Sequence, residues 1–163
     1  MDQFFFYNPD ILIFTQLALA AALGGFLGIE RVIAGKWAGI RTYALMSLGS
    51  CFAIIISQSV ISNLIAGQVD INPLQVFAAI LTGVGFIGAG LVFQHESKVS
   101  GLTTAAGIWV ASIIGVSVGY QLYTTAIFTT LLTLFIFTGL WFVEQRIREA
   151  ARNIPHEDDR SAQ

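Results

Sequence analysis

The stretch that decides the fold is LQVFAAILTGVGFIGAGLVF, which runs from Leu74 to Phe93. It contains no charged residue and is long enough for a helix that crosses a bilayer, which needs about 20 apolar residues. It also contains G-x-G-x-x-G over residues 83–88, the spacing that cradles a dinucleotide in soluble enzymes. A dinucleotide site would need an acidic residue about 20 positions further on, but position 108 is Ile108 and residues 97–143 contain no Asp or Glu. We therefore predict a spanning helix whose glycines serve packing.

The composition places the whole chain in the membrane class. Of the 163 residues, 55% are hydrophobic and 11% are charged, and the mean hydropathy is +0.74. About a quarter of the residues in a soluble domain are charged, so the bilayer is the expected solvent of this protein. The single cysteine, Cys51, cannot form an internal disulfide and is interpreted as a small buried apolar residue.

Clusters of charge divide the chain into long uncharged intervals. These intervals predict five spans, over residues 11–29, 42–66, 74–93, 102–118 and 122–143. The last two spans come from one interval that is too long for a single crossing and is divided at Gly119. We expect an all-α integral membrane protein with a transmembrane domain over residues 1–143 and a charged cytoplasmic tail over residues 144–163.

The basic residues predict the orientation. All eight Lys and Arg residues lie in the first connection, the third connection or the tail, which the positive-inside rule places in the cytoplasm. The N-terminus is then on the outer side, as an odd number of helices requires. A cleavable signal peptide is the alternative for the first span. Signal peptides carry positive charge before their apolar run, whereas Asp2 and Asp10 precede this run and Arg31 follows it.

Two segments of the chain resemble each other. KWAGIRTYALMSLGS, from Lys36 to Ser50, aligns with KVSGLTTAAGIWVAS, from Lys98 to Ser112, at an offset of 62. Just before them, GFLG at 25–28 matches GFIG at 85–88 at an offset of 60. Shared small-residue composition is the alternative explanation. If the match is a repeat, the first two helices are duplicated as the third and fourth, in parallel, about an axis along the membrane normal.

Small residues predict where helices approach closely. The hydrophobic drive between helices is weak in lipid, so backbone contact through small residues supplies much of the association. The packing candidates are Gly24, Gly28, Gly83, Gly85, Gly88 and Gly90. The same glycines make a homodimer an expectation, unless contacts within one chain use all of them.

Polar residues at the predicted cytoplasmic ends of the helices are the candidates for a site. Glu30 is expected to pair with Arg31 or Arg41 near the mouth between the two hairpins. The alternative is that these charges only set topology. Thr103 and Thr104 open the fourth helix, where unpaired N–H groups can hold a carboxylate or a phosphate.

Several classes of function lack support in the sequence. No ionisable side chain lies in the middle of a predicted span, which weakens ion-coupled transport. Magnesium transport is not eliminated, because Mg²⁺ often keeps its bound water. No nucleophile–base pair or His-x3-His spacing is present, so we predict neither an enzyme nor a cofactor, and metal binding stays undecided. Orientation explains the basic residues, so no nucleic-acid surface is predicted.

Two long blocks resemble the MgtC/SapB family of bacterial inner-membrane proteins. GGFLGIERVIAGKWAGIRTYALMSLGS at 24–50 is similar to the family's first block, with its Glu-Arg pair and A-G-[IL]-R-T turn. GVGFIGAGLVFQHESKVSGLTTAAGIWVASIIG at 83–115 is similar to the second block. By motif, the positions carried over as functionally important are Glu30, Arg31, Gly39, Arg41, Thr42, Gly101, Thr103 and Thr104.

The resemblance implies a small polytopic protein of the bacterial inner membrane. The outer side, to which the charges assign the N-terminus, is then the periplasm, and the C-terminus is cytoplasmic. Family members are linked to growth at low magnesium and to the survival of pathogens inside macrophages. One member, a virulence factor with a soluble C-terminal domain, is associated with restraint of the F-type ATP synthase. That domain has no counterpart in the charged tail here, which favours a shorter kind of family member and puts a virulence role in doubt.

The favoured interpretation is a non-enzymatic regulatory protein linked to magnesium limitation or stress adaptation. It would bind a membrane partner, by family analogy the F-type ATP synthase, or a ligand at the cytoplasmic mouth. The alternative is a channel or transporter for magnesium or another small solute.

Overall fold

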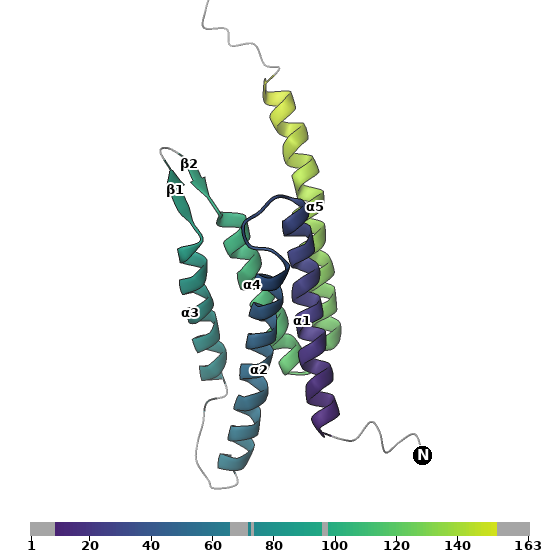
Figure 1. Ribbon diagram of the computed structural model, residues 1–163, viewed down its shortest axis with the longest axis vertical. Coiled ribbons are helices and arrows are strands. Elements are labelled where there is room, and N and C mark those ends of the chain that lie inside the picture. The colour runs from purple at the N-terminus through teal and green to yellow at the C-terminus, as the bar shows by residue number, and fades with distance from the viewer. Residues whose placement is uncertain (1–8, 66–71, 73, 96–97, 153–163) are drawn as a thin grey trace, which may run out of the picture.

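The computed structural model describes residues 9–65, 72, 74–95 and 98–152. Five helices run roughly side by side, and a short strand hairpin lies at one end (Figure 1). In chain order the elements are α1 (Pro9–Ile33), α2 (Ile40–Ile65), α3 (Leu74–Gly90), β1 (Phe93–His95), β2 (Lys98–Ser100), α4 (Leu102–Gly119) and α5 (Tyr123–Arg152).

Four of these helices, α1, α2, α4 and α5, are long and apolar enough to cross a membrane. The remaining helix, α3, is apolar but has 17 residues. At 1.5 Å per residue it extends about 25 Å, which is less than the roughly 30 Å of a typical hydrocarbon core. The all-helical membrane architecture is therefore confirmed for four spans, and the fifth crossing stays a prediction.

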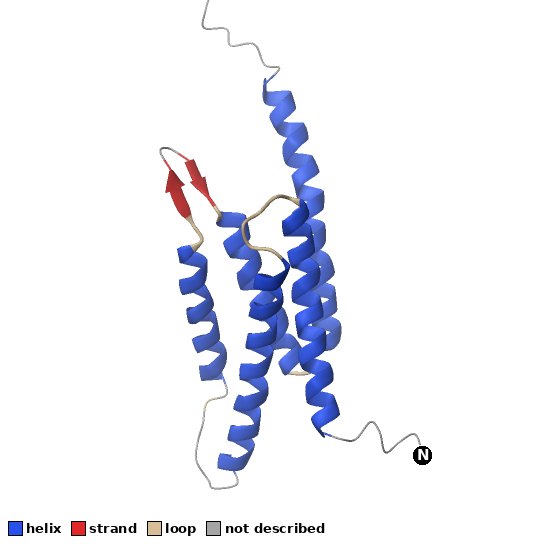
Figure 2. Cartoon of the chain, in the orientation of Figure 1, coloured by secondary structure: helices blue, strands red, loops and turns tan. Residues whose placement is uncertain are grey.

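The predicted end of the third helix was wrong. A helix was expected to continue to Phe93, but α3 ends at Gly90 and the chain turns into an antiparallel hairpin, in which Phe93 pairs with Ser100 and His95 with Lys98 (Figure 2). The predicted span depended only on the absence of charged residues, which does not distinguish a helix from a strand. Aromatic and β-branched residues around the turn favour strand, and glycine favours the end of a helix.

Two other helix boundaries also differ from the predicted spans. Within the described residues, α1 extends from Pro9 and so starts before the predicted span at residue 11. α5 does not end at residue 143 but continues to Arg152, so a large part of the predicted tail is helical. The remainder of that tail lies outside the described residues.

The core is built around α4, which packs against the four other helices. Ile108, Ala111 and Ile114 are fully buried. A Cβ added at Gly115 would collide with the backbone carbonyl of Ser47, so the two backbones touch where α4 crosses α2. At the far end of α4, the Gln16 amide donates hydrogen bonds to the carbonyls of Val118 and Gly119, at 3.0 and 3.3 Å, and caps the helix.

The contact between α2 and α4 joins two residues that the proposed repeat makes equivalent. The hydroxyls of Ser50 and Ser112 are hydrogen bonded to each other in the buried interface. Equivalent residues meet each other at a two-fold axis, so this contact lies where the axis of a parallel repeat would pass. The repeat itself stays a prediction.

The segments that carry the basic residues gather at one end of the bundle. The α1–α2 connection, the β1–β2 hairpin and the last turns of α5 lie together at that end, which we call the basic end (Figure 1). The start of α1 and the turn between α4 and α5 lie at the opposite end. The positive-inside rule requires the basic segments to lie on one side of the membrane, and this arrangement meets that requirement. The assignment of the basic end to the cytoplasm stays a prediction.

Candidate functional site

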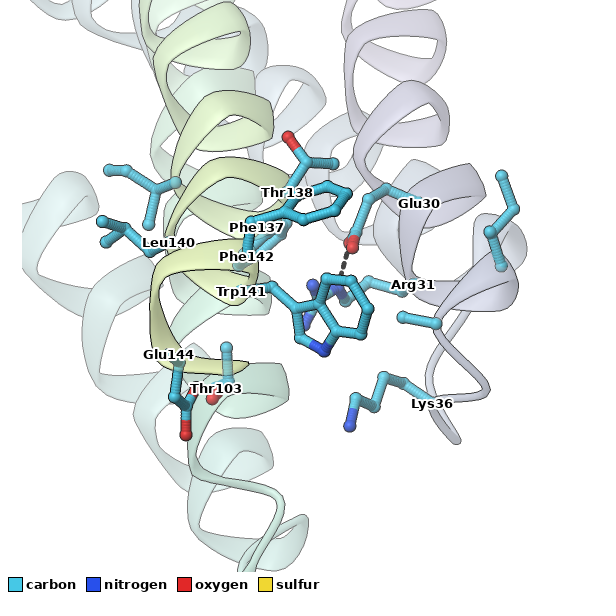
Figure 3. Close-up of a pocket in the computed structure, with 13 residues that line it drawn as sticks. Glu30, Arg31, Lys36, Thr103, Phe137, Thr138, Leu140, Trp141, Phe142 and Glu144 are labelled. Atoms are coloured by element: carbon cyan, nitrogen blue, oxygen red, sulfur yellow. Dashed lines mark hydrogen bonds and ion pairs between the residues drawn. The ribbon is translucent and has the colours of Figure 1, made fainter. Parts of the chain in front are cut away.

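A cavity of about 740 Å³ opens at the basic end between α1, α5 and the first turn of α4. Glu30, Arg31, Lys36 and Thr103 line its polar side (Figure 3). Its other wall comes from α5 and is mostly apolar, with Ile136, Phe137, Leu140, Trp141 and Phe142 beside the polar Thr138 and Glu144. The cavity has the volume of a small-molecule site, which is usually 300–1,000 Å³.

Arg31, at the end of α1, is the buried charged side chain on the polar side of the cavity. It is 4% exposed, and its Nε donates to the carboxylate of Glu30. Its Cζ lies 3.7 Å from the centroid of the Phe137 ring, which places the cation over the aromatic face. Residues i and i+1 of a helix do not face each other, so both side chains must bend toward the space between α1 and α5 to meet.

The ring that supports Arg31 is itself fixed by α4 and α2. A Cβ at Gly107 would collide with both the Tyr43 hydroxyl and the Phe137 ring, so glycine allows the two aromatic residues to pack there. The Tyr43 hydroxyl donates to the carbonyl of Thr104 at 3.2 Å. Four helices therefore contribute to the position of one guanidinium group.

The structure decides between the two ion pairs expected for Glu30. The partner is Arg31, while Arg41 is exposed at the start of α2 and does not line the cavity. Thr103 reaches the cavity. Thr104 is buried behind it and acts through its carbonyl, and Thr42 lies outside the cavity lining.

Two of the glycines named as site candidates shape the connections between helices. Gly101 has φ 90°, and a Cβ there would collide with the carbonyl of Leu91, so glycine lets the chain turn from β2 into α4. A Cβ at Gly39 would collide with the Val32 side chain, and the Gly39 carbonyl accepts from the Tyr43 N–H at 3.1 Å. Neither glycine lines the cavity.

The packing glycines differ between α1 and α3. A Cβ at Gly24 would lie 2.5 Å from the carbonyl oxygen of Tyr43, and one at Gly28 would lie 2.5 Å from the Cα of Ile40. A Cβ at Gly88 would lie 3.7 Å from the Ala105 Cβ, an ordinary contact. The remaining three, Gly83, Gly85 and Gly90, meet no other described atom within 4 Å of a built Cβ.

Sequence reasoning missed Phe137, Trp141 and Tyr43. Phe137 and Trp141 lie in the aromatic, uncharged run of α5, where nothing distinguishes the ring below Arg31 from its neighbours. Lys36 lines the cavity as well, although its sequence context indicated only membrane orientation and the similarity of the two segments. Within the described residues, no three His, Cys, Asp or Glu side chains gather as metal ligands.

These features define an α-helical membrane protein with a charged, cation–π-supported cavity at one end of its bundle. A model of the MgtC family matches residues 17–146. The chain therefore belongs to the MgtC family.

Three curated relatives illustrate this membership. The putative magnesium transporter YhiD of Escherichia coli K12 is 38% identical over 122 residues, which cover 74% of this chain and 57% of YhiD. Protein MgtC of Brucella abortus strain 2308 is 38% identical over 70% of this chain and 45% of its own length. Protein SapB of Bacillus subtilis 168 is 33% identical over 94% of this chain and 65% of its own length. The chain thus spans about half to two thirds of these relatives. No solved structure matches it.

Proposed function

We propose that this protein is a non-enzymatic regulator of the bacterial inner membrane that works through the cavity at its basic end during magnesium limitation. One observation carries the proposal: a buried, ion-paired arginine forms the wall of a ligand-sized cavity. Burying a charge is unfavourable unless its interactions compensate, and such groups are therefore retained most readily where they hold a ligand or switch between partners. The basic end is proposed to face the cytoplasm.

Family membership supports the physiological context. The relative YhiD carries the name putative magnesium transporter, which favours a link to magnesium. A membrane partner is proposed to bind the long exposed end of α5 and to respond to ligand binding in the cavity. The family resemblance suggests an F-type ATP synthase as this partner.

A growth experiment tests the role of the cavity. In a strain whose growth at low magnesium depends on this protein, the double variant Glu30→Gln/Arg31→Gln should lose growth support. It changes both charges, so no unpaired charge is left buried. Arg41→Gln is the matched control, because Arg41 belongs to the same sequence block but lies outside the cavity. Equal loss in the two variants, at equal protein levels, would contradict the proposal.

The second candidate is a magnesium channel or transporter, which the name of YhiD favours. Magnesium flux into proteoliposomes separates the two functions. The regulatory proposal expects no flux beyond that of empty liposomes. Protein-dependent magnesium movement that Glu30→Gln abolishes and Arg41→Gln leaves intact would replace it with the transport function.

A further inference from the structure

One cation that lines the cavity has no ion-pair partner among the described residues. Arg31 and Lys36 line it together with Glu30 and Glu144, and the exposed Glu144 is paired with Arg148. Lys36 is exposed and makes no ion pair among the described residues. Both carboxylates of the lining are thus paired, Glu30 with Arg31 and Glu144 with Arg148, which lies outside the lining. Lys36 leaves one positive charge that an anion would balance.

The guanidinium of Arg31 has donors to spare. Within the described part of the chain, Nε is its one nitrogen with a hydrogen-bond acceptor, the carboxylate of Glu30. An arginine presents five N–H donors in a planar fork that matches the oxygens of a phosphate. Because Arg31 lines the cavity, an acceptor inside the cavity can use the remaining donors.

The start of α4 adds further donors on the same side. Gly101 supplies no side-chain cap, so the N–H groups of the first turn have no side-chain acceptor from it. Thr103, in that turn, lines the cavity. The partial positive charge of a helix start favours an anion there, and it acts here beside two cationic side chains.

The opposite wall suits hydrocarbon. Ile136 and Leu140 are four residues apart, as are Phe137 and Trp141, so the two pairs form one face of α5 toward the cavity. The rim is open, because Ile33, Trp141 and Phe142 are 82%, 53% and 66% exposed. Tryptophan is enriched at the level of lipid headgroups, which is where the basic end would lie in a bilayer. Figure 3 shows the aromatic residues of α5 opposite Glu30, Arg31 and Lys36 of α1 and its connection.

We propose that the cavity binds one anionic phospholipid. Its phosphodiester would lie between Arg31, Lys36 and the start of α4, and an acyl chain would lie along Ile136 and Leu140 of α5. This inference rests on the cavity of the proposed function and names its ligand class. Basic pockets between helices at the cytoplasmic side of membrane proteins hold such headgroups, and the volume of about 740 Å³ suits a headgroup with part of a chain better than a partner helix.

Native mass spectrometry tests the proposal with the full chain in detergent. Protein is incubated with phosphatidylglycerol, phosphatidylcholine or inorganic phosphate, and bound species are counted while thermal stability is recorded. Phosphatidylglycerol should remain bound and raise the unfolding temperature, and phosphatidylcholine and inorganic phosphate should do neither. If inorganic phosphate stabilised the protein as much as phosphatidylglycerol does, the ligand would be a free anion and the lipid proposal would be overturned. If phosphatidylcholine were retained as well as phosphatidylglycerol, the proposed selectivity for an anionic lipid would be overturned.

Matched variants locate the lipid. Lys36→Gln should weaken phosphatidylglycerol binding about fivefold, from the usual contribution of one basic residue near anionic lipid, while Arg41→Gln should leave it near wild type. Ile136→Trp fills the proposed chain site from a partly exposed position and should reduce binding without unfolding the protein. Equal losses for Lys36→Gln and Arg41→Gln would overturn the site in favour of general attraction.

These outcomes separate the lipid from the function. If the double variant Glu30→Gln/Arg31→Gln loses growth support while wild-type protein binds no phosphatidylglycerol, the lipid is overturned and the cavity keeps its proposed role. If lipid binding is confirmed and growth is unaffected, the proposed function is overturned and the lipid site stands.

Discussion

α1 and α3 contain similar motifs near their C-terminal ends, GFLG at 25–28 and GFIG at 85–88, yet the two helices pack differently. In α1, Gly24 and Gly28 bring the backbone against α2, and the helix ends in the buried pair of Glu30 and Arg31. In α3, Gly88 makes an ordinary contact and the helix ends in a strand hairpin. A glycine pattern in a membrane helix therefore indicates a capacity for close packing, and the surrounding helices decide whether it is used.

The difference follows from the position of α5. This helix packs against α1 and α4, and its Phe137 ring supports Arg31. α1 is therefore enclosed by three neighbours, whereas α3 packs mainly against α4 and has few contacts with α2. The fifth helix has no counterpart in the proposed repeat. It packs on one side of the bundle and forms a wall of the cavity there.

The largest effect is expected when the charge that joins α1 to α5 is removed. Arg31→Gln leaves Glu30 largely buried without its cation, which should lower the free energy of unfolding by about 3 kcal/mol. The double variant with Glu30→Gln should recover part of this loss. Chemical unfolding in detergent measures both. Hydrogen exchange should rise in α1 and α5 and stay unchanged in α3. Equal loosening of α3 would break the comparison between the two helices.

Alanine at equivalent glycines tests the packing difference directly. A Cβ at Gly28 meets backbone atoms of Ile40 and Gly39 that cannot move aside locally, so Gly28→Ala should lower unfolding free energy by about 2 kcal/mol. Gly88→Ala adds a methyl group at an ordinary contact distance from Ala105 and should be close to neutral. Thermal unfolding of the two variants in the same detergent checks the order. A reversed order would show that α3 is the tightly packed helix.

The hydroxyl pair between α2 and α4 offers a smaller effect. Ser50→Ala and Ser112→Ala should each cost about 0.6 kcal/mol, the usual value of a side-chain hydrogen bond between membrane helices. Because both variants remove the same bond, the double variant should cost little more than either one. If the two losses in unfolding free energy were additive in a double-mutant cycle, the two hydroxyls would not be in contact. The proposed repeat axis would then lose the contact that supports it.

The sequence predicted what depends on hydrophobicity and failed where three-dimensional packing decides. Four long helices followed from uncharged intervals, since a bilayer selects such segments strongly. The hairpin at Phe93 was missed because an apolar run does not distinguish strand from helix over a few residues. Beyond the fifth span, Glu144 and Arg148 are four residues apart, a spacing that predicts an extension of the helix into water. The structure confirms it, because the two side chains pair and α5 continues to Arg152.

The candidate site was predicted in part for the same reason. Glu30 and Arg31 are adjacent in the sequence and rare charges beside apolar runs, so their pairing could be proposed. The sequence could not choose between Arg31 and Arg41, because the choice depends on the ring of Phe137, which comes from a helix more than one hundred residues further along the chain. The cavity is likewise formed by three segments that are far apart in the sequence.

The smallest effect is expected at the uncovered glycines of α3. Gly85→Ala should change the free energy of unfolding by less than about 0.5 kcal/mol, because no described atom lies within 4 Å of the added Cβ. Size measurement of the detergent-solubilised protein should give the same mass for the variant and the wild type. A clear loss of stability together with a smaller particle would show that a second copy covers this face of α3 in the membrane. In that homodimer, α3 would make with the second copy the kind of close backbone contact that α1 makes with α2 within one chain.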